Sequence, residues 1–115
     1  MFTYKGKEFR CPVEVTMGMI SGKWKSLILW HLHEGPIRYK ALERIVPGVS
    51  QKMLTQQLKE MEDDGFLVRT VYPEVPPRVE YELTDLGHSV YPILEQMQAW
   101  AISNLGCEPE SHDAE

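Results

Sequence analysis

Polar side chains that can recognise DNA are concentrated between residues 50 and 59. They are Ser50, Gln51, Lys52, Thr55, Gln56 and Lys59. Glutamine can form two hydrogen bonds with adenine, lysine binds guanine or a phosphate, and hydroxyl groups bind either. Leu54, Leu58 and Met61 recur on the opposite side of a helix with this spacing. The segment therefore predicts a helix whose polar side lies in the major groove; the alternative is an ordinary solvent-exposed helix face.

Basic and aromatic residues at two other places are candidates for contacts with the DNA backbone. Arg38 and Tyr39 begin a short predicted helix. Arg78 ends a segment (73–78) whose three prolines prevent strand pairing, stiffen the tip of a predicted hairpin and lower the entropy lost on docking. We predict that Arg78 reaches the minor groove or a phosphate; the alternative is a stiff surface turn. Further basic candidates are Lys23, Lys25 and Arg69, of which Arg69 has a structural role as its alternative.

Cys11 offers a thiol at the predicted start of a helix, before Pro12. The N–H groups of a first helical turn favour a thiolate, whereas the nearby carboxylate of Glu14 disfavours one. One interpretation is a redox switch in which Cys107 is the resolving partner, across a dimer if one forms. The alternative is a small buried apolar Cys11 and an incidental Cys107.

The sequence gives no sign of a catalytic, metal or cofactor site. His31 and His33 are two residues apart, so a helix would direct them differently. Two cysteines are too few for a zinc site on their own. We therefore expect neither catalysis nor a bound metal ion, and the interpretation needs no cofactor.

The net charge of −5 over 115 residues is unevenly distributed. Residues 1–78 hold 12 basic and 9 acidic residues, whereas residues 79–115 hold eight acidic residues and no lysine or arginine. This asymmetry predicts one side that faces DNA and another kept away from it. The length suits one domain over residues 1–115. With no long apolar run and no secretory signal at the start, we expect a cytoplasmic protein without membrane contact.

Periodicity and turn residues predict the elements that would hold these side chains. We predict an arm (1–10), a first helix (11–20), a second helix that ends before Gly35, a helix-turn-helix (38–64), a hairpin wing (66–83), a last helix (85–105) and a flexible tail (106–115). Within 38–64, a three-residue turn at Pro47-Gly48-Val49 separates the two helices. The order is that of a mainly α winged helix-turn-helix fold with a small β-hairpin.

The last predicted helix carries an apolar stripe that is wider than one small domain needs. Its candidate contacts with a second chain are Val90, Ile93, Leu94, Met97, Trp100 and Ala101. The alternative is that this helix covers only its own core. A symmetric dimer would set two recognition helices about one turn of DNA apart and would bind a pseudo-palindromic site.

Four stretches together resemble the HxlR-type transcriptional regulators, over about residues 10–103. They are GKWKSLIL (22–29), SQKMLTQQLKEME (50–62), DGFLVR (64–69) and YPEVPPRVEYELT (72–84). The resemblance implies bacterial, MarR-related, DNA-binding homodimers whose first and last helices form the dimer, which adds Val13, Met17 and Ile20 to the interface. It also implies that Cys11 stands where many members carry a cysteine, which in some relatives senses oxidants or electrophiles.

We therefore predict a dimeric repressor that leaves a pseudo-palindromic operator when Cys11 is oxidised or modified by an electrophile. One alternative is control by a small molecule of unknown identity, bound near Trp24, Tyr91 or Trp100. A second is a protein-interaction module without operator binding, which the acid-free side of 50–59 disfavours. A third is a thiol-dependent enzyme.

Overall fold

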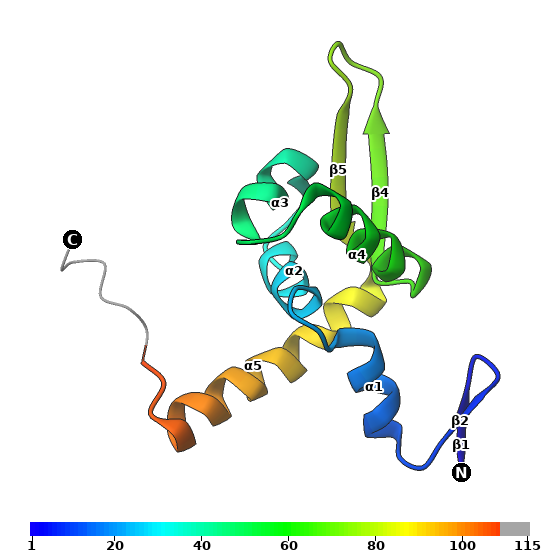
Figure 1. Ribbon diagram of the computed structural model, residues 1–115, viewed down its shortest axis with the longest axis vertical. Helices are drawn as coiled ribbons and strands as arrows, with labels where there is room; N and C mark the ends of the chain where they lie inside the picture. Colours follow the sequence, from blue (N-terminus) through cyan, green and yellow to red (C-terminus); the bar gives the residue numbers. More distant parts are fainter. Residues whose placement is uncertain (109–115) are drawn as a thin grey trace.

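The computed structural model describes residues 1–108, which form five helices, a three-stranded sheet and a separate hairpin (Figure 1). The helices are α1 (Pro12–Ile20), α2 (Lys25–Leu32), α3 (Tyr39–Ile45), α4 (Gln51–Asp63) and α5 (Asp85–Leu105). The strands are β1 (Phe2–Tyr4), β2 (Lys7–Phe9), β3 (Ile37–Arg38), β4 (Leu67–Tyr72) and β5 (Arg78–Leu83). The helix pair α3–α4 and the wing β4–β5 confirm the predicted winged helix-turn-helix fold.

Hydroxyl side chains start the two longest helices, as the sequence predicts. The N–H of Met53 donates to Ser50 Oγ at 3.1 Å, and the N–H of Gly87 donates to Thr84 Oγ1 at 3.1 Å. These bonds satisfy N–H groups that the first turn of a helix leaves without partners. α5 ends at Gly106, whose φ of 69° is left-handed. The predicted flexible tail starts there, and from residue 109 onward it lies outside the described residues.

The wing belongs to a three-stranded antiparallel sheet of order β3-β5-β4. β3 pairs with β5 through Ile37 and Arg38, a strand that we did not predict. Two residues are too few to show alternation, and their partner strand lies far along the chain, so the sequence carries no local signal for it. Arg78, which we assigned to the unpaired tip, pairs with Tyr72 in the β4–β5 ladder. The tip is therefore confined to residues 73–77.

The first ten residues form a hairpin, which corrects the predicted irregular arm. β1 and β2 pair antiparallel, with Phe2 opposite Phe9. The turn residues Lys5 and Gly6 have φ of 48° and 76°, the two positive values that a type I′ turn needs. The local signal for this turn was Gly6, which follows the alternating segment Phe2-Thr3-Tyr4. Lys5 Nζ also lies 3.4 Å from Asp64 Oδ1, after the end of α4.

One core joins the helices to the sheet. Its fully buried side chains come from α2, α3, α4 and the turn after α3, namely Ile28, Leu29, Leu32, Leu42, Val46, Leu54, Leu58 and Met61. The sheet and the first half of α5 close this core with Phe66, Leu67, Tyr81, Leu83, Val90 and Leu94. Because α4 buries its apolar side here, its polar side is left facing outward.

Three residues predicted to contact a second chain belong instead to this core. Ile20, Val90 and Leu94 are 3 %, 7 % and 6 % exposed. Their place in the predicted interface is thus corrected. A wide apolar stripe on a helix can pack against the chain's own core and against a second chain at once. The sequence alone does not show which apolar residues contact the core and which contact the second chain.

The elements predicted to contact DNA and those predicted to contact a second chain lie toward opposite ends of the molecule (Figure 1). The wing, α3 and α4 lie at one end, and α1 and the second half of α5 extend from the other. Within residues 1–108, no helix has the length and apolar content needed to cross a membrane.

Candidate nucleic-acid interface

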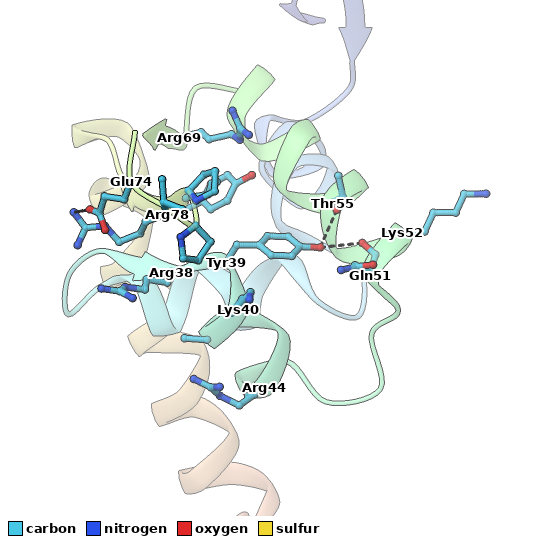
Figure 2. A pocket seen from close by; sticks show the side chains of 16 residues that line it. Arg38, Tyr39, Lys40, Arg44, Gln51, Lys52, Thr55, Arg69, Glu74 and Arg78 are labelled. Atoms are coloured by element: carbon cyan, nitrogen blue, oxygen red, sulfur yellow. Dashed lines mark hydrogen bonds and ion pairs between the residues drawn. The ribbon is translucent and has the colours of Figure 1, made fainter. Parts of the chain in front are cut away.

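α3, α4 and the wing enclose a groove of about 980 Å³ (Figure 2). Side chains of α3 and α4 form one side of the groove. The tip of the wing and side chains of β4 and β5 form the other side. The lining comprises Arg38, Tyr39, Lys40, Ala41, Arg44, Gln51, Lys52, Thr55, Arg69, Glu74, Val75, Pro76, Pro77, Arg78, Val79 and Tyr81.

The groove concentrates positive charge. Its cationic side chains are Arg38, Lys40, Arg44, Lys52, Arg69 and Arg78. Glu74 is the one carboxylate among the described residues of the lining. A chain with a net charge of −5 thus presents a strongly cationic concave surface, which attracts an anionic polymer such as DNA.

α4 presents its predicted polar residues to solvent. Gln51, Lys52 and Thr55 line the groove, whereas Gln56 and Lys59 are exposed but lie outside the lining. Lys59 Nζ lies 3.1 Å from Asp63 Oδ1 one turn further along, and both side chains are largely exposed. Such a pair contributes about 0.3–0.5 kcal/mol, so it leaves Lys59 free to exchange partners.

Tyr39 fastens α3 to the first turns of α4. Its phenolic oxygen lies 3.3 Å from the main-chain oxygen of Gln51, to which it donates, and 2.9 Å from Thr55 Oγ1 (Figure 2). The side chain is half-buried and also packs against the core. Tyr39 therefore stabilises the helix pair and also lines the groove.

Arg78 is held against the wing. Its guanidinium nitrogens lie 3.0 Å from Glu74 Oε2 and 3.4 Å from Glu80 Oε2, and its Cζ lies 4.0 Å from the centre of the Tyr72 ring. Its Nε is buried without a hydrogen-bond partner in the described part of the chain. The predicted outstretched arginine is thus a side chain that braces the tip and adds little free charge to it.

Arg69 lies on β4 opposite Tyr81 of β5. Burial raises the pKa of the Tyr81 phenol above its usual value of 10.0, and the Arg69 guanidinium acts in the opposite direction. Tyr81 therefore keeps its proton through the physiological pH range. Arg69 is exposed and lines the groove, so both of its alternatives, structural and DNA-facing, are compatible with this position.

Two groove cations were missed as individual sites. Lys40 and Arg44 lie four residues apart on α3, so they share one helix face, and both line the groove. The signal was available in the sequence, because both are basic residues of the predicted helix-turn-helix (38–64) and lie at helical spacing.

Lys25 is corrected from a candidate DNA contact to a structural residue. It is 8 % exposed, and its Nζ lies 3.2 Å from Glu60 Oε1, which connects α2 to α4. A buried cation of this kind keeps its partner, since leaving it unpaired is costly. Trp24 packs against the core, and Lys23 Nζ lies 5.6 Å from the centre of its ring.

Apolar side chains at the other end of the molecule are exposed. Val13, Met17, Ile93, Met97 and Trp100 are between 44 % and 64 % exposed, and Ala101 is half-buried. They lie on α1 and α5, the two helices predicted to form a dimer. An apolar surface of this kind is typical of a protein–protein interface.

Both cysteines are free thiols and both are exposed, so a buried Cys11 is wrong. Cys11 occupies the position before the first turn of α1. The N–H groups of Arg10 and Cys11 donate to Glu14 Oε1 at 3.1 and 3.2 Å. The carboxylate that we expected to oppose a thiolate therefore lies at the same cap as the thiol.

His33 and His88 make contacts with aromatic rings. The ring of His33 stacks on Tyr91 with centroids 3.4 Å apart, and His88 lies edge-on at 6.0 Å. These contacts connect α2 to α5. Among residues 1–108, no three histidine, cysteine, aspartate or glutamate side chains gather in a way that could hold a metal ion.

Comparison with known proteins places the chain in a family. Residues 19–109 match the HxlR-like helix-turn-helix family. The chain is 48 % identical over 101 residues to YybR of Bacillus subtilis (strain 168), an uncharacterised HTH-type transcriptional regulator, which covers 88 % of this chain and 80 % of YybR.

Two solved structures have the same fold. The redox regulator HypR in its reduced form has a TM-score of 0.78 and 47 % identity, covering 82 % of this chain and 93 % of HypR. A MarR-family transcriptional regulator from Porphyromonas gingivalis W83 has a TM-score of 0.78 and 42 % identity, covering 88 % of this chain and 99 % of that one. With a cationic groove between its recognition helix and its wing, this chain belongs to the HxlR-like helix-turn-helix family and is a transcriptional regulator with a DNA-binding winged helix-turn-helix domain.

Proposed function

We propose that two copies of this chain bind a pseudo-palindromic operator in the cytoplasm and repress transcription from it. The groove between α3, α4 and the wing carries the proposal, because it collects five cations besides the paired Arg78 on a protein whose net charge is negative. Attraction to phosphate alone gives binding without sequence preference, so the bases must be read by the polar side of α4.

In this proposal α4 enters the major groove. Gln51, Thr55 and Gln56 face base edges, and Lys52 and Lys59 bind phosphates. Ser50 Oγ already accepts the N–H of Met53, so its own proton is free to be donated to a phosphate oxygen at the start of the helix.

α3 and the wing hold the DNA backbone on either side of α4. Arg38, Lys40 and Arg44 line one wall of the groove and bind phosphates there. The wing approaches the minor groove through its tip, where the side chain of Val75 is fully exposed. The ion pairs of Arg78 with Glu74 and Glu80 stabilise this tip.

A dimer is supported by the uncovered apolar side chains of α1 and α5. Met97 and Trp100 lie on the part of α5 that leaves the core, at the end of the molecule away from the cationic groove (Figure 1). Pairing there buries apolar surface and leaves both recognition helices free to face DNA.

The proposed repressor is controlled by a thiol switch at Cys11. Cys11 is exposed at the start of α1, and HypR, which shares 47 % identity with this chain, is described as a redox regulator. The Cys11 thiolate attacks one oxygen of a peroxide, which breaks the O–O bond, releases hydroxide or an alkoxide and leaves a sulfenic acid. The thiol of a second cysteine, Cys107 of the other copy, then forms a disulfide with release of water. A covalent link at the dimer interface changes the spacing of the recognition helices and weakens operator binding.

The test is selection of fragmented genomic DNA by the purified, reduced protein, followed by sequencing. We expect enrichment of a few intergenic sites with pseudo-palindromic symmetry. Arg44→Glu reverses one groove charge and should abolish the enrichment, whereas Arg10→Glu, which changes an arginine outside the groove, should preserve it. Equal recovery of all fragments by the reduced protein would contradict operator binding.

A second candidate is control by an apolar small molecule. A hollow of about 400 Å³ lies between α2 and α5, lined by Ser26, Leu27, Trp30, Leu94, Met97 and Gln98. It lies where the DNA-binding body meets the proposed dimer helix, although Trp24, Tyr91 and Trp100, which we named for such a site, are not part of the lining. A Cys11→Ser protein that still leaves its operator in response to the natural inducer would favour this candidate over the thiol switch.

A further inference from the structure

Tyr39 contacts the recognition helix at two atoms. Its phenolic oxygen lies 3.3 Å from the main-chain oxygen of Gln51 and 2.9 Å from Thr55 Oγ1. Figure 2 shows both contacts on the side of α4 that faces the groove. Tyr39 is half-buried while Thr55 is exposed, so the phenol reaches from the helix interface to a side chain that is open to a ligand.

The directions of these two hydrogen bonds follow from counting protons. A phenol has one O–H to donate, and a carbonyl oxygen can only accept. The contact with Gln51 therefore uses the Tyr39 proton. The contact with Thr55 then exists as a hydrogen bond only if the Thr55 hydroxyl donates its own proton to the phenolic oxygen. The opposite direction would make one bond in place of two.

This arrangement restricts what Thr55 can offer to the groove. Its proton is committed to Tyr39, but its oxygen retains a lone pair that can accept. Thr55 therefore meets DNA as an acceptor. In the major groove the donors are the amino groups of adenine and cytosine, whereas guanine and thymine present acceptors at the corresponding positions.

We propose that Tyr39 is a specificity-determining positioning residue, which fixes the Thr55 hydroxyl as an acceptor and so selects adenine or cytosine over guanine or thymine at the base facing Thr55. The inference rests on the proposed operator binding, since it concerns which bases the operator contains. Tyr39 itself acts through Thr55.

The experiment is competitive binding of purified full-length variants to a selected operator, with all four bases at each half-site position. In the wild-type protein we expect one position at which adenine or cytosine is preferred about three- to tenfold, the effect of one hydrogen bond. Tyr39→Phe frees the Thr55 proton for donation, so the preference at that position should fall below about twofold. Preferences at the other positions should be unchanged.

Two further variants separate this role from a merely structural one. Thr55→Val keeps the shape of the side chain and removes the acceptor, so it should abolish the same preference, and adding Tyr39→Phe to it should change nothing at that position. Tyr91→Phe removes a phenolic oxygen on α5 and is the matched control, with wild-type preferences expected throughout.

Three outcomes would contradict the inference, and each has a different cause. If Tyr39→Phe weakens binding equally for all four bases, with or without Thr55→Val, the tyrosine only fastens α3 to α4. If Thr55→Val keeps the preference, Thr55 does not read a base. If the wild-type protein selects no sequence at all, the proposed operator binding fails, and the inference fails with it.

Discussion

Individual side chains in the groove differ in how free they are to meet DNA. Gln51 and Lys52 extend from the first turn of α4 with no side-chain partner among the described hydrogen bonds and ion pairs, whereas Arg78 is tied to Glu74 and Glu80. A side chain with no protein partner breaks no intramolecular contact when it binds a base, whereas Arg78 must first give up two ion pairs. Base recognition should therefore depend on α4 far more than on Arg78.

Gln51→Ala tests this dependence. We expect discrimination against the wrong base at one operator position to fall by about 1–3 kcal/mol, because a bidentate glutamine–adenine pair is lost. Affinity for random duplex DNA should change little. Equilibrium binding to the operator, to its single-base variants and to a random duplex measures all three quantities. An equal loss on every duplex would instead assign Gln51 to the backbone.

Cys11→Ser tests the thiol switch. The reduced wild-type and the variant should bind the operator equally, since serine keeps the size of the side chain at the start of α1. After treatment with hydrogen peroxide, the wild-type should lose operator affinity and form a disulfide-linked dimer, and the variant should do neither. Gel-shift titration and non-reducing electrophoresis check these outcomes, and Cys107→Ser shows whether the second thiol is required. Equal sensitivity of Cys11→Ser to peroxide would rule the switch out.

At the scale of elements, the close approach of α5 to the loop before β4 fixes where the wing starts. A Cβ on Gly87 would collide with the main-chain oxygen of Phe66 and press on Leu83. That same oxygen accepts the N–H of Thr84 at 2.9 Å. The sheet and the last helix are thus joined at one crowded point, which orients the wing relative to α4.

Gly87→Ala should therefore destabilise the protein, although alanine favours helices over glycine by about 1 kcal/mol. The clash is with main chain, which cannot swing aside, so we expect a net loss of about 1–3 kcal/mol in the free energy of unfolding. Urea denaturation followed by circular dichroism measures it. Gly18→Ala in α1, where a Cβ meets nothing within 4 Å, is the matched control and should be neutral or stabilising.

Elements that begin at a local interaction could be predicted from the sequence, whereas an element that depends on a distant strand could not. Ser50 and Thr84 mark the starts of α4 and α5 in the sequence, because the capping of a helix by a hydroxyl group is a local interaction. β3 had no such signal, since it exists only through pairing with β5. The polar residues of α4 could likewise be assigned from spacing, whereas the ion pairs of Arg78 depend on the register of the wing.

At the scale of the whole molecule, charge and apolar surface are separated. The described region measures 50 × 48 × 25 Å, with the cationic groove at one end and exposed apolar side chains of α1 and α5 at the other (Figure 1). Each end can bind a different partner without obstructing the other. The separation fits a dimer that binds DNA on one face.

Trp100→Glu should convert the proposed dimer to monomers. The side chain is 59 % exposed on the projecting part of α5, so a charge there would not disturb the core but would be buried on dimerisation. We expect at least roughly a tenfold rise in the dimer dissociation constant. Sedimentation equilibrium measures it. Val75→Glu at the wing tip, an equally apolar exposed site, should leave the dimer intact; a dimer unaffected by Trp100→Glu would place the interface elsewhere.

The bracing of Arg78 by two carboxylates also has a thermodynamic consequence for the regulator. A protein that neutralises DNA phosphates releases condensed counterions, and log affinity then falls against log salt concentration with a slope of about −0.9 per phosphate neutralised. With Glu74 and Glu80 beside it, Arg78 already has its counterions built into the wing. The ionic-strength dependence of binding is therefore set by the other cations of the groove, Arg38, Lys40, Arg44, Lys52 and Arg69, while Arg78 adds little to it.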